Sequence, residues 1–194
     1  FPDLETVDFG GGFGVRYKEG DCALDVERMG AALKSRVEAF QQQMGRRLRF
    51  ALEPGRFLVA EGMALLATVQ DKKTGSDGRV FLGLDAGFNQ LMRPALYDSP
   101  HEILNLSRPD GALAAYDICG NICESTDFFA RAREIPAAEE GDVLAVMNYG
   151  AYGAAMGSVY NLRAPAAEVF FEGERSWLTR GRAGLEDMLS SFVE

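Results

Sequence analysis

Two glycine-containing turns near the start of the sequence have the residue types of an anion-binding site. Residues 10–14 read Gly-Gly-Gly-Phe-Gly, and residues 53–56 read Glu-Pro-Gly-Arg. Glycine allows backbone N–H groups to approach an anion such as phosphate closely, and an arginine can bind phosphate or carboxylate through two parallel hydrogen bonds. Taken alone, the glycine-rich turn could have a purely steric cause, and the arginine of the second turn could simply be solvated. The two turns in succession favour an anion site.

Three later segments carry groups that could act on a small polar ligand. Arg93 and Tyr97 lie four residues apart in a proline-containing loop and could present a cation and a hydroxyl group. Cys123 is followed by Glu124, and a thiol beside a carboxylate can donate a proton when its surroundings set a suitable pKa. Residues 150–161 are rich in small side chains that permit close packing beside a ring. Each of these segments, taken alone, also fits an ordinary surface or packing role.

The cysteines do not favour a metal site. Cys119 and Cys123 are four residues apart, but the sequence has only three cysteines and a single histidine, His101. These are too few for the usual zinc ligand sets, so we expect no metal and interpret Cys22 and Cys119 as structural thiols. The odd and sparse cysteine count fits a reducing, cytoplasmic compartment.

Composition narrows the classes of partner. The 194 residues carry a net charge of −9 and are 47% apolar, which is enough for a sizeable core. The acidic balance argues against nucleic acid or an anionic membrane as the main partner. No apolar run approaches the roughly 18 residues that a membrane-spanning helix needs.

The elements that would position these motifs change character along the chain. Residues 4–9 and 48–52 are predicted strands, and an apolar spacing of three and four predicts a helix between Asp25 as N-cap and Gly45 as C-cap. The apolar stretch 57–69 is predicted to be helical at first. A strand–helix–strand–helix order is typical of βα units with a parallel sheet, in which consecutive βα turns can form a phosphate site.

After residue 69 the pattern is that of a mainly antiparallel sheet domain. A polar turn is predicted at 72–78 and a closing helix at 185–192. The predicted strands are residues 80–84, 102–106, 114–119, 142–147 and 168–171.

Taken in order, these motifs resemble those of the fold-type III, pyridoxal-phosphate-dependent amino-acid decarboxylases. The resemblance extends from Asp8 to about Arg182 and rests on GGGFG at 10–14, EPGR at 53–56, DAGFNQLMRPALY at 85–97, CESTD at 123–127 and GAYGAAMGSVYN at 150–161. It implies an α/β plus β fold, with the C-terminal βα units of a TIM (alanine racemase-like) barrel in residues 1–66. A mainly antiparallel β-sheet domain with a closing helix would follow in residues 67–194.

The resemblance also implies a cofactor, pyridoxal 5'-phosphate, and a role for each motif. The residues implied in binding the cofactor are Gly12, Glu53, Pro54, Gly55, Arg56 and Tyr152. The residues implied in binding the substrate are Arg56, Arg93, Tyr97, Glu124 and Tyr152. Cys123 would be the catalytic proton donor, and because it and Glu124 would reach the active site of a second copy, we expect a homodimer with shared sites.

Within the family, the resemblance implies decarboxylation of meso-2,6-diaminopimelate to L-lysine and CO2, a step of lysine biosynthesis. Glu124 together with Arg56 and Arg93 suits a substrate end that carries both an ammonium group and a carboxylate. Asn121 and Thr126 depart from the usual proline and glycine of the family, as do Ala154, Ala155 and Leu162 nearby. Decarboxylation of another basic amino acid (lysine, ornithine or arginine, L or D) and a non-catalytic homologue that only binds partners remain as alternatives.

We expect the chain to be the C-terminal part of a longer polypeptide. A complete TIM barrel needs about 250 residues, and only two βα units precede the sheet domain here. None of Lys18, Lys34, Lys72 and Lys73 stands at a strand end suited to the family's Schiff-base lysine. Because a partial barrel exposes strand edges, this part alone is expected to aggregate or to bind the rest of the barrel.

Overall fold

A strand–helix–strand unit opens the chain in the computed structural model, which describes residues 3–18, 20–190 and 192. Strands β1 (Thr6–Asp8) and β2 (Arg49–Ala51) pair in parallel. In the sequence they precede and follow helix α1 (Val26–Met44). Both predicted caps of α1 are confirmed: the Asp25 carboxylate accepts a hydrogen bond from the Arg28 N–H, and Gly45 ends the helix at φ 64°. The predicted parallel arrangement is thus present in the first unit.

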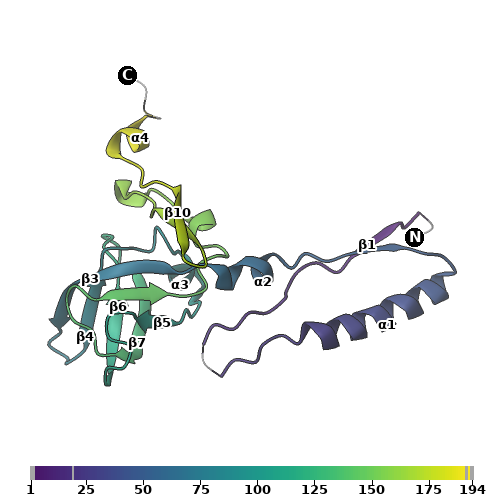
Figure 1. The fold of residues 1–194 in the computed structure, drawn as a ribbon, viewed down its shortest axis with the longest axis horizontal. Helices are drawn as coiled ribbons and strands as arrows, with labels where there is room; N and C mark the ends of the chain where they lie inside the picture. The colour runs from purple at the N-terminus through teal and green to yellow at the C-terminus, as the bar shows by residue number, and fades with distance from the viewer. Residues whose placement is uncertain (1–2, 19, 191, 193–194) are drawn as a thin grey trace.

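Helix α1 has an apolar side that no other element fully covers. No residue of the helix is buried, although apolar side chains recur at helical spacing from Met29 to Met44. Figure 1 shows α1 well separated from the six-stranded sheet, with only the β1–β2 pair accompanying it. In proteins, most helical stability comes from packing such a face against neighbours.

The second predicted helix is confirmed only in part. Helix α2 (Gly55–Val59) is followed by a 3₁₀ turn, η1 (Ala60–Gly62), and the chain is extended from Leu65 onward. The prediction of a polar turn from residue 72 was wrong for residues 72–74, because β3 (Leu65–Thr74) continues through both lysines and pairs with β4 (Val80–Leu84). The expected boundary between residues 66 and 67 lies within β3.

The rest of the chain is organised around a six-stranded sheet with the strand order β5-β8-β3-β4-β6-β7. All neighbours are antiparallel except β4 and β6, which confirms the predicted mainly antiparallel sheet. The predicted strands are found, with small shifts, as β4, β5 (Ile103–Asn105), β6 (Leu113–Cys119), β8 (Val143–Val146) and β9 (Glu168–Glu172).

Besides β3, two further strands and a helix were not predicted. Strand β7 (Phe128–Pro136) is interrupted by charged residues and by Ala132 at φ 45°, so its sequence lacks a regular alternation. Strand β10 (Arg175–Arg180) forms a hairpin with β9, in which the rings of Phe170 and Trp177 lie 4.9 Å apart. The proline-containing loop is in fact helix α3 (Arg93–Tyr97), since a proline in the first helical turn needs no N–H donor.

Two short 3₁₀ turns and a helix complete the chain. Turns η2 (Ala154–Met156) and η3 (Tyr160–Leu162) follow β8, and helix α4 (Leu185–Leu189) follows the hairpin (Figure 1). The predicted closing helix is confirmed but ends earlier than residue 192, and Ser191 lies outside the described residues. None of the helices in the described part of the chain has the length and apolar character that a bilayer span requires.

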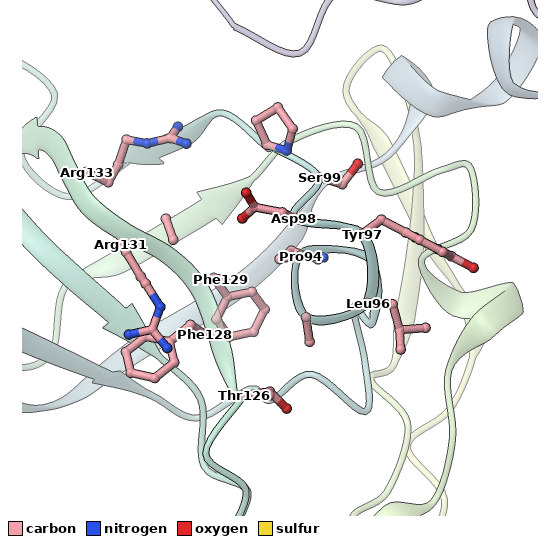
Figure 2. A pocket seen from close by; sticks show the side chains of 13 residues that line it. Pro94, Leu96, Tyr97, Asp98, Ser99, Thr126, Phe128, Phe129, Arg131 and Arg133 are labelled. Carbon is pink, nitrogen blue, oxygen red and sulfur yellow. The ribbon is translucent and has the colours of Figure 1, made fainter.

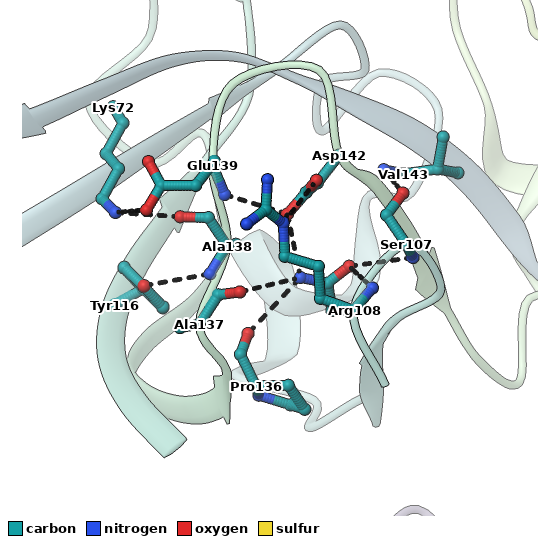
Figure 3. Close-up of polar contacts among 11 residues, drawn as sticks. Lys72, Ser107, Arg108, Tyr116, Pro136, Ala137, Ala138, Glu139, Asp142 and Val143 are labelled. Atoms are coloured by element: carbon teal, nitrogen blue, oxygen red, sulfur yellow. Dashed lines mark hydrogen bonds and ion pairs between the residues drawn. The ribbon is translucent and has the colours of Figure 1, made fainter. Parts of the chain in front are cut away.

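A buried carboxylate joins the loops at one end of this sheet (Figure 3). Asp142 accepts hydrogen bonds from the Asn105 amide, the Glu139 N–H and the Arg108 side chain. Nearby, Lys72 donates to the Ala138 carbonyl and pairs with Glu139 at 2.8 Å. Burial by itself raises the pKa of Asp142, but the hydrogen bonds it accepts outweigh burial and hold that pKa below its usual value.

We predict that Asp142→Ala destabilises the fold by about 2 to 4 kcal/mol, because it leaves buried donors without an acceptor. In the wild type, the contribution of Asp142 is present above the pKa of an unfolded aspartate and is lost as the pH falls through the lower folded value. Denaturant unfolding of the full-length protein between pH 7 and pH 3 checks both statements.

The matched control is Asp71→Ala, which removes a carboxylate that pairs with Lys73 on an exposed stretch of β3. A surface ion pair contributes about 0 to 1 kcal/mol. Equal losses in the two variants would contradict the role given to Asp142.

Candidate functional site

The two glycine-containing turns of the sequence lie against each other at the ends of the parallel strands. The Glu53 N–H donates to the Gly10 carbonyl at 2.8 Å, and the Phe9 N–H donates to Ala51 at 3.1 Å. Gly11 is required here by close approach, since a Cβ atom at this position would lie 2.8 Å from the Glu53 carbonyl oxygen. The parallel pairing of β1 and β2 therefore brings the predicted cofactor-binding turns together.

The glycine-rich turn offers backbone donors. Within the part of the chain that the structure describes, no acceptor pairs with the N–H groups of residues 11–14. Gly12 has φ +88°, and nothing lies within 4 Å of the position that its Cβ would occupy. Successive free N–H groups in such a turn form a site for an anion such as a phosphate.

The sheet domain reaches this region through the segment that follows β8. The Tyr149 N–H donates to the Met63 carbonyl and the Gly150 N–H to the Ala60 carbonyl, at 2.9 and 3.1 Å. A Cβ atom on Gly150 would lie only 1.8 Å from the Val59 carbonyl oxygen. Glycine at this position thus allows the 149–153 segment to lie directly on α2 and η1.

Four of the predicted site residues meet where this segment lies on α2. The Arg56 guanidinium is 5.6 Å from the centre of the Tyr152 ring, and the Arg93 guanidinium lies 5.3 Å from the same ring. Arg93 is also 5.5 Å from the ring of Tyr97. These contacts, which we call the Arg–Tyr cluster (Arg56, Arg93, Tyr97 and Tyr152), join three segments that are far apart in the sequence. Tyr152 is 43% exposed and Tyr97 61%, so the cluster is open to a ligand.

Arg93 is the buried member of the cluster. Its side chain donates to the Ser99 hydroxyl at 2.9 Å, while its buried Nε has no hydrogen-bond partner. The residue is only 8% exposed, yet no carboxylate of the described residues forms an ion pair with it. A buried cation without a counter-charge is costly, so this position favours an anionic ligand.

Cys123 and Glu124 lie on the loop between β6 and β7, which Asp127 holds in shape. The Asp127 carboxylate accepts hydrogen bonds from the Phe88 and Ile122 N–H groups, both at 2.7 Å. Burial raises the pKa of Asp127, and these hydrogen bonds oppose that shift. Gly120 makes room for the same carboxylate, which would lie 2.4 Å from a Cβ atom at that position.

The structure does not bring the two loop residues into the Arg–Tyr cluster. Cys123 is an exposed free thiol, and among the described residues the Glu124 side chain accepts hydrogen bonds only from Ser125 and Thr126 of its own loop. No hydrogen bond, ion pair or ring contact among the described residues links either of them to Arg56, Arg93 or Tyr152. Eight of the ten predicted site residues thus belong to the two glycine-containing turns or to the Arg–Tyr cluster, whereas Cys123 and Glu124 stand apart.

A cavity of about 720 Å³ lies between α3 and the first residues of β7. Figure 2 shows Phe128, Phe129 and Arg131 on one side of it and the α3 turn on the other, with the Tyr97 side chain directed outward. Its lining includes Tyr97 and Thr126 but neither Arg56 nor Arg93, so this cavity adjoins the site without forming it. In the described residues, no three histidine, cysteine or acidic side chains converge as metal ligands would.

The sequence reasoning assigned no role to two residues that the site depends on. Asp127 lies within one of the quoted motifs, but only the fold shows that it holds the Cys123 loop. His101 was considered only as a possible zinc ligand, although it is fully buried and contacts the Met147 carbonyl and the Tyr17 ring. The only sequence signal for a role of Asp127 and His101 was their residue type, and it is a weak one. It is a signal because carboxyl and imidazole groups need specific partners when they are buried.

Comparison with known proteins identifies the family. The family described as "Pyridoxal-dependent decarboxylase, C-terminal sheet domain" matches residues 33–150, and the one described as "Pyridoxal-dependent decarboxylase, pyridoxal binding domain" matches residues 2–60. The chain belongs to the pyridoxal-dependent decarboxylase family. The two models together match residues 2–150, in the order in which the turns and the sheet occur.

Individual relatives are more specific. The chain is 41% identical over 189 residues to the diaminopimelate decarboxylase of Methanothermobacter thermautotrophicus, covering 96% of the chain and 44% of the relative. It is 43% identical over 189 residues to that of Neisseria meningitidis serogroup A, covering 97% and 44%. A crystal structure of diaminopimelate decarboxylase from M. jannaschii in co-complex with L-lysine superposes with a TM-score of 0.90 at 32% identity, covering 98% and 43%. The chain thus spans less than half the length of each of these decarboxylases.

We predict that Gly150→Ala separates the sheet domain from α2, because the new methyl group cannot fit against the Val59 carbonyl. The expected cost is about 2 kcal/mol or more, which corresponds to a fall in Tm of several degrees. Differential scanning calorimetry of the full-length protein measures it.

The control for this variant is Gly62→Ala in the same region, where nothing lies within 4 Å of a new Cβ atom. We expect this variant to match the wild type in Tm. A Gly150→Ala protein with an unchanged Tm would show that the contact with α2 is not needed.

Proposed function

We propose that the chain is the C-terminal part of an enzyme that decarboxylates meso-2,6-diaminopimelate to L-lysine and CO2. The observation that carries the proposal is Arg93, a buried guanidinium between two tyrosine rings with no carboxylate partner among the described residues. A substrate carboxylate supplies the missing counter-charge. The names of the relatives support this choice of substrate class.

Residues 1–66 are proposed to be the last βα units of a TIM barrel, and residues 67–194 the sheet domain. The parallel β1–β2 pair and the uncovered apolar side of α1 support this, because both are expected of an element whose barrel neighbours lie elsewhere. By the same reasoning, the Schiff-base lysine belongs to the remainder of the barrel. We also propose a cytoplasmic enzyme, which the three free cysteines support.

The glycine-rich turn fits pyridoxal 5'-phosphate. The free N–H groups of residues 11–14 would hold its phosphate, with Gly12 leaving room for it and the 53–56 turn alongside. Arg56 and Tyr152 stand at the edge of this region, where they would face both cofactor and substrate. When bound, the cofactor supplies a protonated pyridine ring that accepts the electron pair left on the substrate as CO2 departs.

The residues of this chain bind and orient the substrate. Arg93 and Arg56 would hold the carboxylate of the end that does not react, and the Tyr97 hydroxyl lies at the rim of the same space. Glu124 would pair with the ammonium group of that end. The distal end of diaminopimelate carries a carboxylate and an ammonium group, so it needs both the arginines and Glu124. An amino acid whose distal end carries only an ammonium group needs only Glu124.

Cys123 is proposed to donate the proton that replaces the departing CO2. The exposed position of its thiol supports delivery to the site of a second copy, as does the absence, among the described residues, of a hydrogen bond between its loop and the Arg–Tyr cluster. The active unit would then be a homodimer in which each site combines one copy's Arg–Tyr cluster with the other copy's Cys123 and Glu124.

The proposal is tested with the purified full-length protein and pyridoxal 5'-phosphate. We expect CO2 release from meso-diaminopimelate, with at least a hundredfold lower kcat/KM for lysine, ornithine and arginine. The reason is that the distal end of each of these amino acids lacks one of the two charges that the site would pair, or carries its charge in another arrangement. Release from one of those amino acids instead would retain the family and replace the substrate. Absence of turnover with every amino acid would favour a homologue that only binds partners.

A heterodimer tests the shared site. We predict that Cys123→Ala and Arg56→Gln homodimers are each inactive, since one lacks the proton donor and the other an anion-binding group. A heterodimer of the two, purified through two different affinity tags, should regain about half of the wild-type activity, because one of its two sites is intact.

The control is a heterodimer of Cys123→Ala with a second, differently tagged Cys123→Ala subunit, which should stay inactive. If the mixed heterodimer were also inactive although both copies bind the cofactor, each site would be formed within a single copy.

A further inference from the structure

His101 lies at a junction of four segments. It is fully buried, its Nδ1 is 2.7 Å from the Met147 carbonyl oxygen, and the ring of Tyr17 meets it edge-on at 5.5 Å. Its own carbonyl accepts a hydrogen bond from Arg133 at 2.9 Å. The imidazole thus connects the chain that follows the glycine-rich turn, the end of β8, β7 and the segment after α3.

The surroundings fix the protonation state of this imidazole. A carbonyl oxygen only accepts hydrogen bonds, so Nδ1 carries a proton, and in the neutral ring Nε2 is then an acceptor. The charged groups that act on the ring are the cations Arg93 and Arg133. Burial lowers the pKa of His101, the two arginines lower it further, and the Met147 bond opposes them. A neutral ring is therefore the form that can occupy this position beside two positive charges.

Two unpaired polar atoms remain in this buried region, and they are complementary. His101 Nε2 is an acceptor without a donor, and Arg93 Nε is a donor without an acceptor. Buried polar atoms in native proteins are almost always paired. Arg93 reaches the His101 segment through the hydroxyl of Ser99, which stands two residues before His101. No other buried atom that lacks a partner in the described residues lies on these segments.

We propose that His101 is a positioning residue for Arg93: its Nε2 accepts a hydrogen bond from the Arg93 Nε–H and holds the guanidinium between Tyr97 and Tyr152. With Nε bonded to the imidazole and one Nη group to Ser99, the remaining N–H groups of the fork point to a ligand carboxylate. A carboxylate in this position would neutralise the charge of the arginine. A neutral acceptor holds the arginine and leaves its charge available. This inference rests on the proposed function, because it concerns the affinity of Arg93 for a substrate carboxylate.

Two substitutions separate this role from a purely structural one. The side-chain amide of His101→Asn can still donate to Met147, because its nitrogen lies near the position of Nδ1, but nothing remains at the position of Nε2. His101→Gln places its amide at the Nε2 position and can offer an oxygen to Arg93 instead. The two variants therefore retain different halves of the hydrogen bonding.

The test uses the full-length protein loaded with pyridoxal 5'-phosphate, L-lysine as the probe in isothermal titration calorimetry, and turnover kinetics with meso-diaminopimelate. We expect His101→Asn to raise the Kd for lysine and the KM about tenfold, with kcat within about twofold, since one charged hydrogen bond is worth about that much. His101→Gln should stay within about threefold of the wild type. In an Arg93→Gln background, His101→Asn should have no further effect.

A ligand control isolates the carboxylate. The diamine pentane-1,5-diamine is lysine without its carboxylate, so its affinity should be the same in the wild type and in His101→Asn. The inference is overturned if His101→Asn binds lysine as the wild type does, if His101→Gln is impaired as much as His101→Asn, or if the effects of the His101 and Arg93 substitutions are additive. If the wild type itself neither binds lysine nor turns over diaminopimelate, the proposed function fails instead.

Discussion

The contact of Gly150 with the end of α2 is the constraint on which the candidate site depends. A backbone without a side chain lies against the carbonyl groups of Val59 and Ala60, so that two parts of the chain with different architectures approach within hydrogen-bonding distance. Tyr152 stands two residues after Gly150, and this approach brings it to Arg56. The cation–π contacts of the cluster are individually worth about 0.5 to 2 kcal/mol, far too little to hold the two parts together without the backbone contact.

The site also shows how a charge can be kept available. Other arginines of the described residues, such as Arg79 and Arg108, pair with a carboxylate and have side chains that are at least half exposed. Arg93 instead is buried beside two aromatic rings and a hydroxyl group. These neighbours restrict its position but leave its charge without a counter-charge. The low local dielectric then strengthens its attraction for an anion that enters.

Local sequence patterns predicted most of the fold, because caps, apolar spacing and strand alternation act over a few residues. The caps of α1 and the strand β4 were located to the residue. The course of β7 was missed because a positive φ at Ala132 and several arginines break its alternation, and α2 was predicted too long because an apolar run does not reveal where a helix gives way to a strand. The motif residues were recognised by resemblance, but which of them meet depends on contacts between distant segments. For the same reason, Asp127 and His101 had no visible role in the sequence.

The single parallel pairing of the sheet, between β4 and β6, has a consequence for how such a protein can vary. Two parallel neighbours need a connection that returns along the sheet, and here this connection contains α3, Ser99, His101 and β5. The strands that frame it are fixed by their buried residues, such as Leu82 and Ile118. The exposed part of the connection, such as residues 96–98, can therefore vary, while its buried residues, such as Leu91 and Ile103, belong to the core. Ligand selectivity can thus diverge among proteins with this sheet while the core that supports it stays constant.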